Sequence, residues 1–184
     1  YGPVGHGVAA YARAAGAHVE VVEPNAIRQL TAHYDGFPTP ELDDCLQRVG
    51  IVVTCTGQSG AIKVHGLMKA RNGLVLINAG HGNDEIDVAG IRSAAQKIEQ
   101  VSDHVVRIRL ESGPNLVLLA DGHPLNIVTN AGSPEPVLLH FALLGLTLAW
   151  IAERTLEPGE MAVPPGLEDE AAQLALKALG MAHG

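Results

Sequence analysis

Short runs of aliphatic and β-branched residues alternate with amphipathic stretches along the first hundred residues. The runs at 18–23, 51–56 and 74–78 predict strands, because each is apolar and ends at a turn or polar signal. Helices are expected at 8–15, 26–32, 41–49, 62–70 and 86–96. Strands that alternate with helices in this way are typical of a parallel sheet with helices on both faces.

The pattern changes in the second half of the chain. Residues 105–110 alternate aliphatic side chains with arginines, and 116–120 are apolar again after a turn, which predicts a β-hairpin at the edge of the sheet. Residues 137–154 predict a long helix that is apolar nearly all round, and such a helix must be buried against the sheet or in a subunit interface. A linker rich in Pro and Gly and an amphipathic helix at 167–179 follow.

These elements predict an α/β fold of the Rossmann type, a doubly wound parallel sheet with an edge β-hairpin and C-terminal helices. We expect residues 1–154 to form this domain, and residues 155–184 to form a linker and a C-terminal helix. The chain opens directly on a glycine turn, without a preceding strand or an initiator methionine. We therefore interpret it as a fragment of a longer protein whose substrate domain lies outside this chain.

Composition narrows the possible partners. The formal net charge of −8 argues against nucleic acid, whose phosphates need lysine and arginine. The apolar run 137–151 is interrupted by His140 and is too short to span a bilayer, so no membrane partner is expected. Cys45 and Cys55 are in no metal-ligand spacing, and neither are the histidines, so we expect no metal site. Free thiols fit a cytoplasmic location.

The most informative motif is the opening turn, a G-x-G-x-x-G fingerprint without its first glycine. Gly2 would let the backbone approach a pyrophosphate, and Gly5 would let the next helix pack closely on the sheet. Glu23 follows about twenty residues later, where an acid accepts hydrogen bonds from the adenosine ribose and repels a 2′-phosphate. The motif therefore indicates NAD. The alternative is an ordinary strand-to-helix turn, since glycines close those as well.

Together these segments resemble the NAD-binding domain and C-terminal part of the S-adenosyl-L-homocysteine hydrolase (adenosylhomocysteinase) family. The resemblance rests on the opening turn, on 54–57, on the block Asn78-Ala79-Gly80-His81 followed by Glu85-Ile86-Asp87, and on 118–122 with Asn126. It implies a hydrolase of one-carbon metabolism that keeps NAD bound, oxidises the 3′-hydroxyl of a nucleoside thioether reversibly, and carries out elimination and addition at C5′. It also implies a cytoplasmic homo-oligomer, a tetramer in the family.

The resemblance further implies a role for individual residues. His81 would reach the substrate and move protons as the catalytic group; the alternative is an ordinary loop histidine after a glycine turn. The implied cofactor-binding residues are Gly2, Pro3, Val4 and Gly5 at the pyrophosphate, Glu23 at the ribose, Thr56 and Gly57 beside the dinucleotide, and Ala79, Gly80 and Asn126 at the nicotinamide end.

Two other groups near this block have structural interpretations. Asp84, Glu85 and Asp87 resemble a catalytic carboxylate cluster, but acids in the first turn of a helix explain them better. Cys55 stands beside the expected cofactor and is interpreted as a buried thiol at a strand end.

The chain departs from the family pattern on the substrate side. Gly82 stands where the family has Phe, and Ser133 stands where it has the His of the gate over the nucleoside. The family's catalytic Lys and Asp belong to the substrate domain. We therefore expect the full-length parent to be a thioether hydrolase and this chain alone to be inactive. Two alternatives stay open, a catalytically silent NAD-binding regulatory homologue and a D-2-hydroxyacid-dehydrogenase-like oxidoreductase with exchangeable cofactor.

Overall fold

The computed structural model describes residues 1–132 and 134–181. It divides into two compact units, the first over Tyr1–Ala131 and the second beginning at Gly132. The second unit contains both C-terminal helices, whereas the sequence suggested a boundary at residue 154; that boundary stays a prediction for the whole protein. The departure at Ser133 lies outside the described residues.

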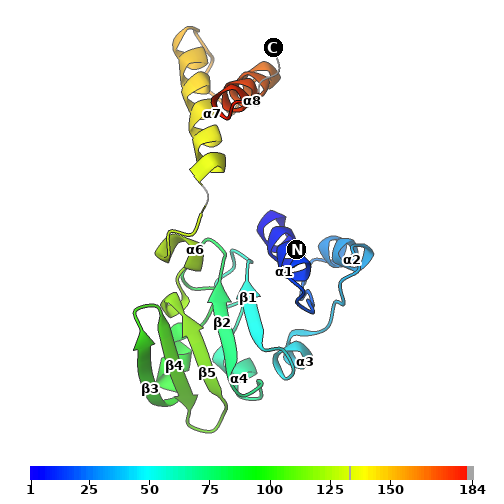
Figure 1. Ribbon diagram of the computed structural model, residues 1–184, viewed down its shortest axis with the longest axis vertical. Helices are drawn as coiled ribbons and strands as arrows, with labels where there is room; N and C mark the ends of the chain where they lie inside the picture. The colour runs from blue at the N-terminus through cyan, green and yellow to red at the C-terminus, as the bar shows by residue number, and fades with distance from the viewer. Residues whose placement is uncertain (133, 182–184) are drawn as a thin grey trace. The chain divides into compact units, whose positions relative to one another are not determined.

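The first unit is built on a five-stranded sheet with the strand order β1-β2-β5-β4-β3 (Figure 1). β1 (Ile51–Thr54), β2 (Leu74–Asn78) and β5 (Asn115–Leu119) run parallel to one another. β4 (Val105–Leu110) and β3 (Ala95–Ser102) continue the sheet in antiparallel pairing. The α/β fold of the Rossmann type is confirmed, in a mixed rather than purely parallel form.

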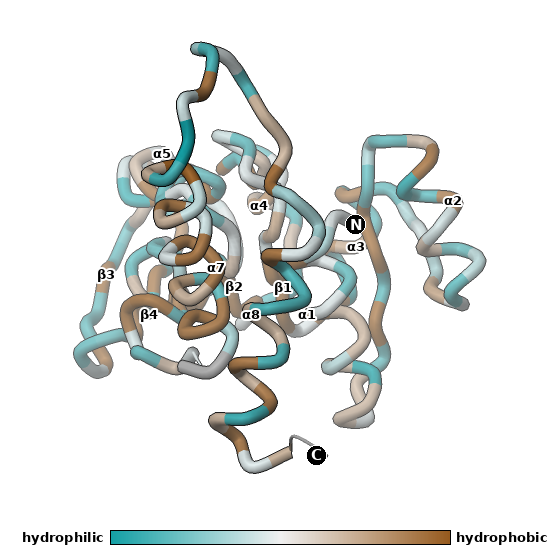
Figure 2. The backbone as a smooth tube through the Cα atoms, turned by 90° about the horizontal axis from the view of Figure 1, so that it is seen from above, coloured by the Kyte–Doolittle hydropathy of each residue, from teal (hydrophilic) through white to brown (hydrophobic). Residues whose placement is uncertain are grey.

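Helices surround this sheet in the first unit and form a pair in the second. Those of the first unit are α1 (Pro3–Ala14), α2 (Ala26–Tyr34), α3 (Leu42–Leu46), α4 (Val64–Leu67), α5 (Val88–Ser93), the 3-10 turn η1 (Ala120–Gly122) and α6 (Leu125–Val128). In the second unit α7 (Pro134–Ala152) packs against α8 (Pro165–Ala178). Figure 2 shows α7 as apolar along most of its length.

Apolar side chains of the central strands form the main core. Every second side chain of β2 and β5 is buried in this core, namely Leu74 and Leu76 of β2 and Leu116 and Leu118 of β5. Ile108 of β4 belongs to the same cluster. All five are completely buried. This rigid centre fixes the carboxyl ends of β1, β2 and β5, from which the loops of the candidate site extend.

The edge of the sheet differs from the expectation. β4 and β5 do form the predicted antiparallel hairpin, but β5 lies inside the sheet between β2 and β4. The strand at this edge of the sheet is β3, where the sequence suggested the end of a helix at 86–96, and β1 forms the opposite edge. β3 is exposed along almost its whole length and carries Lys97 and Glu99, so it lacks the apolar alternation that reveals a half-buried strand.

The predicted strand at 18–23 is also wrong. This segment is extended but joins no sheet in the described part of the chain. Val21 donates its N–H to the Pro38 carbonyl at 2.9 Å and packs in a small apolar cluster with Ala9 of α1, Ala32 of α2, and Phe37. The segment therefore belongs to a satellite cluster with α1 and α2.

Candidate functional site

Three loops leave the sheet at the carboxyl ends of its parallel strands. One follows Thr54 at the end of β1, another follows Asn78 at the end of β2, and the third begins with η1 after β5. Ligands of open α/β sheets bind outside these strand ends, because there the loops diverge and leave polar groups free. These loops are therefore the candidate site.

Asn78 joins the three loops through one buried amide. Its Oδ1 accepts from the Gly80 N–H at 2.8 Å and from the Thr54 hydroxyl at 3.3 Å. Its Nδ2 donates to the carbonyl of Gly122 at 2.9 Å and to that of Gly82. The side chain is completely buried, and both of its donors are used. The geometry at the strand ends thus depends on Asn78. The sequence analysis included Asn78 in a family motif but predicted no role for it.

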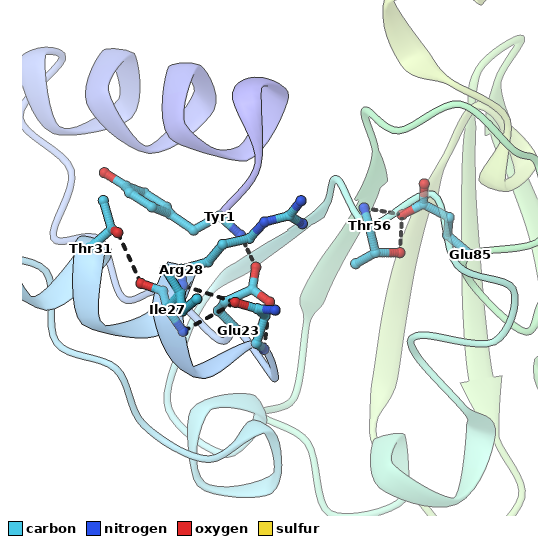
Figure 3. A network of polar contacts seen from close by, with 8 residues as sticks. Tyr1, Glu23, Ile27, Arg28, Thr31, Thr56 and Glu85 are labelled. Atoms are coloured by element: carbon cyan, nitrogen blue, oxygen red, sulfur yellow. Dashed lines mark hydrogen bonds and ion pairs between the residues drawn. The ribbon is translucent and has the colours of Figure 1, made fainter.

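Glu85 is the second organising residue of the site and is completely buried. Its carboxylate accepts from the backbone N–H of Thr56 at 2.8 Å and from the Thr56 hydroxyl at 2.9 Å (Figure 3). It also accepts from the backbone N–H of Gly57 at 2.8 Å. Burial raises the pKa of Glu85, but these donors outweigh burial and hold the pKa below its ordinary value. Glu85 is therefore an ionised group inside the protein.

None of the three acids lies in the first turn of α5, although Asp87 does belong to the N-terminal end of this helix as its N-cap. Asp87 caps α5, and its side chain accepts from the Gly90 N–H at 2.9 Å. Glu85 lies before the helix and reaches back to the loop after β1, so its interpretation was wrong. The glycine at position 80 is a sequence feature that reflects this contact, because a methyl group at Gly80 would overlap the Glu85 carboxylate.

The opening turn places the predicted pyrophosphate residues at the start of α1. Gly2 is the N-cap, and Pro3 is the first helical residue. Among the described residues no side chain caps this end, so the N–H groups of Val4 and Gly5 are available to an anion. A Cβ at Gly5 would lie 3.7 Å from Cβ of Cys55, which shows that α1 closely approaches the end of β1. These features fit a dinucleotide phosphate.

Glu23 lies at the beginning of α2, close to the same turn. Its carboxylate accepts from the Asn25 N–H at 2.9 Å. The Arg28 guanidinium lies beside Gly2, where a Cβ would be 3.7 Å from its Nη1.

The residues predicted at the nicotinamide end follow β2. The Ala79 N–H donates to the Thr54 carbonyl at 2.9 Å, and Gly80 follows it. His81 comes next and is exposed. Asn126 lies on α6, whose start is held to β2 by a bridge between Asn78 and Pro124.

The structure thus brings the predicted residues together as two groups. The first contains the opening turn and Glu23, and the second contains the loops after β1 and β2. Gly5 and Cys55 connect them, since α1 meets the end of β1 there.

Residues 1–132 and 134–181 contain neither a metal-binding cluster nor a membrane-spanning helix. No group of three His, Cys, Asp or Glu residues in this part could hold a metal ion. No helix there is long and apolar enough to cross a membrane. A surface hollow of about 250 Å³ is lined by residues that include Arg92, His104 and Asp121.

Comparison of the amino-acid sequence with known proteins identifies relatives of this chain. The model of the S-adenosyl-L-homocysteine hydrolase NAD-binding domain matches residues 1–132. The chain is 35% identical to an adenosylhomocysteinase of Saccharolobus solfataricus, over 98% of this chain and 44% of that protein. It is 36% identical to an adenosylhomocysteinase of Pyrobaculum aerophilum, over 98% and 42%. It is 32% identical to an S-inosyl-L-homocysteine hydrolase of Methanopyrus kandleri, over 98% and 44%. The chain therefore spans less than half the length of these relatives.

Proposed function

Because this chain belongs to the S-adenosyl-L-homocysteine hydrolase family and carries its NAD-binding domain, we propose that it forms the cofactor side of a nucleoside thioether hydrolase. The observation that carries this proposal is the meeting of the Thr56–Gly57 and Gly80–His81 loops over buried Glu85 at the strand ends. In the proposed reaction the 3′-hydroxyl of the nucleoside is oxidised reversibly, and elimination and addition take place at C5′.

The two groups of residues have separate tasks in holding the cofactor. NAD, when bound, supplies the hydride acceptor for the ribose 3′-hydroxyl. The free N–H groups of Val4 and Gly5 would bind the pyrophosphate at the start of α1. Glu23 would accept from the adenosine ribose diol, since its carboxylate lies close to the opening turn at the start of α2. Gly80 and Asn126 would line the opposite end of the dinucleotide.

His81 is the proposed catalytic residue of this chain. It follows Gly80 on the loop after β2 and is exposed, so its imidazole is free to meet a substrate. An imidazole nitrogen can accept or donate a proton, which suits both the loss of the 5′ thiol and the addition of water. The remaining acid and base groups of the reaction would come from the substrate domain.

The nucleobase of the substrate is a separate question. S-adenosyl-L-homocysteine is the leading candidate, since adenosylhomocysteinases are the relatives with the higher identity. S-Inosyl-L-homocysteine is a second candidate, because the S-inosyl-L-homocysteine hydrolase is 32% identical to this chain. The adenosylhomocysteinase of Thermoplasma volcanium has the same identity, so identity alone does not separate the two substrates. The loop after β2 departs from the family on the substrate side, since Gly82 stands in place of its Phe, and a Cβ there would lie 2.6 Å from Oδ1 of the exposed Asp84 side chain. The loop therefore has no room for the Phe of the family unless Asp84 moves.

A homo-oligomer in the cytoplasm is the proposed state of the full-length protein. α7 supports association, since it carries exposed apolar side chains that include Leu138, Phe141 and Leu148. Such a surface favours a protein partner over water. Two unpaired cysteines agree with a reducing compartment.

The test uses the full-length protein purified without added cofactor. We expect NAD to be released on denaturation, and we expect thiol release from S-adenosyl-L-homocysteine or S-inosyl-L-homocysteine. Bound NAD without exchange of the substrate's C4′ proton with solvent would identify the silent regulatory homologue instead. Turnover of NADH with 2-keto acids would identify a dehydrogenase. Absence of bound NAD would contradict the cofactor assignment itself.

A further inference from the structure

The buried Glu85 carboxylate connects two loops of the candidate site. A buried carboxylate without a basic partner is costly, so it persists only where several donors meet it. Its three donors all come from two consecutive residues, Thr56 and Gly57, which precede it in the chain by about thirty positions. The contact therefore fastens the loop after β1 to the loop after β2.

This contact decides which groups the Thr56–Gly57 loop can offer to a ligand. The N–H groups of Thr56 and Gly57 point inward to Glu85. The Thr56 hydroxyl gives its proton to the same carboxylate and accepts from the Gln58 N–H at 3.0 Å. Three successive N–H groups of the loop are thus already bonded, two to Glu85 and one to the Thr56 hydroxyl, and the carbonyl oxygens of Thr56 and Gly57 are the backbone groups that the loop can offer to a ligand.

The outer surface of the loop is open and free of side chains at its tip. Gly57 adopts a φ of +65°, and no atom lies within 4 Å of a Cβ built there. Both Thr56 and Gly57 are exposed. A flat ligand could therefore approach the backbone closely at this point. Phosphate oxygens need donors, so this loop, unlike the start of α1, is unsuited to the pyrophosphate.

We propose that Glu85 is a positioning residue that makes the Thr56–Gly57 loop a receptor for hydrogen-bond donors of NAD, namely a ribose hydroxyl or the carboxamide NH₂. The inference rests on the proposed function, because it assumes that this loop meets the dinucleotide. It assigns complementary roles to the two halves of the site: the start of α1 donates, and the loop over Glu85 accepts.

The first experiment measures the Kd of NAD for the full-length protein and for Glu85→Gln. Glutamine keeps the length of the side chain but turns an NH₂ toward N–H donors, so the loop must rearrange. We expect the Kd of NAD to rise about tenfold or more, the size that follows from losing one good hydrogen bond. Thr56→Val removes only the hydroxyl donor and leaves the backbone contacts, so a smaller rise is expected, and this variant serves if Glu85→Gln does not fold.

The matched control is Asp87→Ala. This substitution removes a nearby carboxylate that also accepts a backbone N–H, but from α5 and not from the loop. It should lower the melting temperature and leave the Kd of NAD within about twofold of the unsubstituted protein. A lower melting temperature with an unchanged Kd in both Glu85→Gln and Thr56→Val would reduce Glu85 to a structural residue and overturn the proposal.

Analogues of NAD then identify the donor. One has a carboxylate in place of the carboxamide, and others lack single ribose hydroxyls. The analogue that lacks the recognised donor should lose affinity for the unsubstituted protein and lose much less for Glu85→Gln. Equal losses for both proteins with every analogue would contradict the proposed receptor. If the unsubstituted protein does not bind NAD at all, the proposed function fails instead, and the two failures are thereby distinguished.

Discussion

Gly80 and Glu85 compete for the same volume: the Glu85 carboxylate lies where the first carbon of any side chain at position 80 would have to be. The glycine of the Gly-His pair is therefore required by a buried acid five positions later. This requirement is separate from any contact that Gly80 makes with a cofactor.

Gly80→Ala should consequently act through Glu85. The added methyl group would displace the carboxylate from the Thr56 and Gly57 N–H groups, and we expect the free energy of unfolding to fall by about 2 kcal/mol or more. Urea unfolding of the variant measures this. Gly82→Ala is the control, since the atom it would meet belongs to the exposed side chain of Asp84, which can move at small cost. Equal losses in the two variants would argue against the role of Glu85.

The ionised state of Glu85 predicts how stability depends on pH. The pKa of Glu85 is lower in the folded protein than its ordinary value of 4.5, so its contribution to stability is present above that pH and is lost as pH falls through the folded pKa. Glu85→Gln should therefore reduce the loss of stability between pH 6 and the acid range, as measured by denaturant titration at several pH values. Glu111→Gln, on an exposed turn, should leave the profile unchanged.

Asn78 should be among the residues most sensitive to substitution. Asn78→Ala would leave the Gly80 N–H and the Gly122 carbonyl without partners in a buried place, at a cost of about 2–4 kcal/mol. Asn72 offers a comparison, because its exposed amide accepts from the N–H and the side chain of Asn115, both at 2.9 Å. Asn72→Ala should cost less than about 1 kcal/mol, since water replaces the lost contacts. Thermal and urea unfolding of both variants test the difference.

Glu23 should determine the choice between NAD and NADP. Glu23→Ala would remove both the acceptor for the adenosine ribose and the charge that repels a 2′-phosphate, while Arg28 remains nearby. We expect the Kd of NAD to rise about tenfold in the full-length protein and the preference for NAD over NADP to narrow. Calorimetric titration with both nucleotides measures the ratio. An unchanged ratio would place the adenosine ribose elsewhere.

The predictable part of the fold was the part with a regular apolar pattern. β2 and β4 were predicted with their observed bounds, and β1 and β5 within two residues, because each of these strands carries a regular pattern of aliphatic residues. β3 was missed because an exposed edge strand carries polar side chains on both faces. The segment 18–23 was taken for a strand on its apolar residues, but strand formation also needs a partner strand, which a single-segment pattern does not reveal.

The site could be predicted to the level of family and cofactor. The opening turn, the Gly80–His81 block and their order led to the hydrolase family and to NAD, and both are confirmed. The roles of Asn78 and Glu85 escaped prediction, since each side chain also bonds backbone groups of a loop that lies far away in the sequence, Gly122 for Asn78 and Thr56 and Gly57 for Glu85. The hydrophobic periodicity of a sequence does not reveal a contact between a side chain and a backbone N–H that is distant in the chain.

The exposed edge of β1 affects how the isolated chain would aggregate in solution. In the described part of the chain β1 pairs only with β2, and its Ile51 and Val53 side chains are 59% and 36% exposed. An apolar strand with a free row of N–H and C=O groups recruits strands from other molecules. Produced in isolation, the stretch should therefore aggregate edge to edge as its concentration rises, and a lysine introduced at position 51 or 53 should keep it monodisperse.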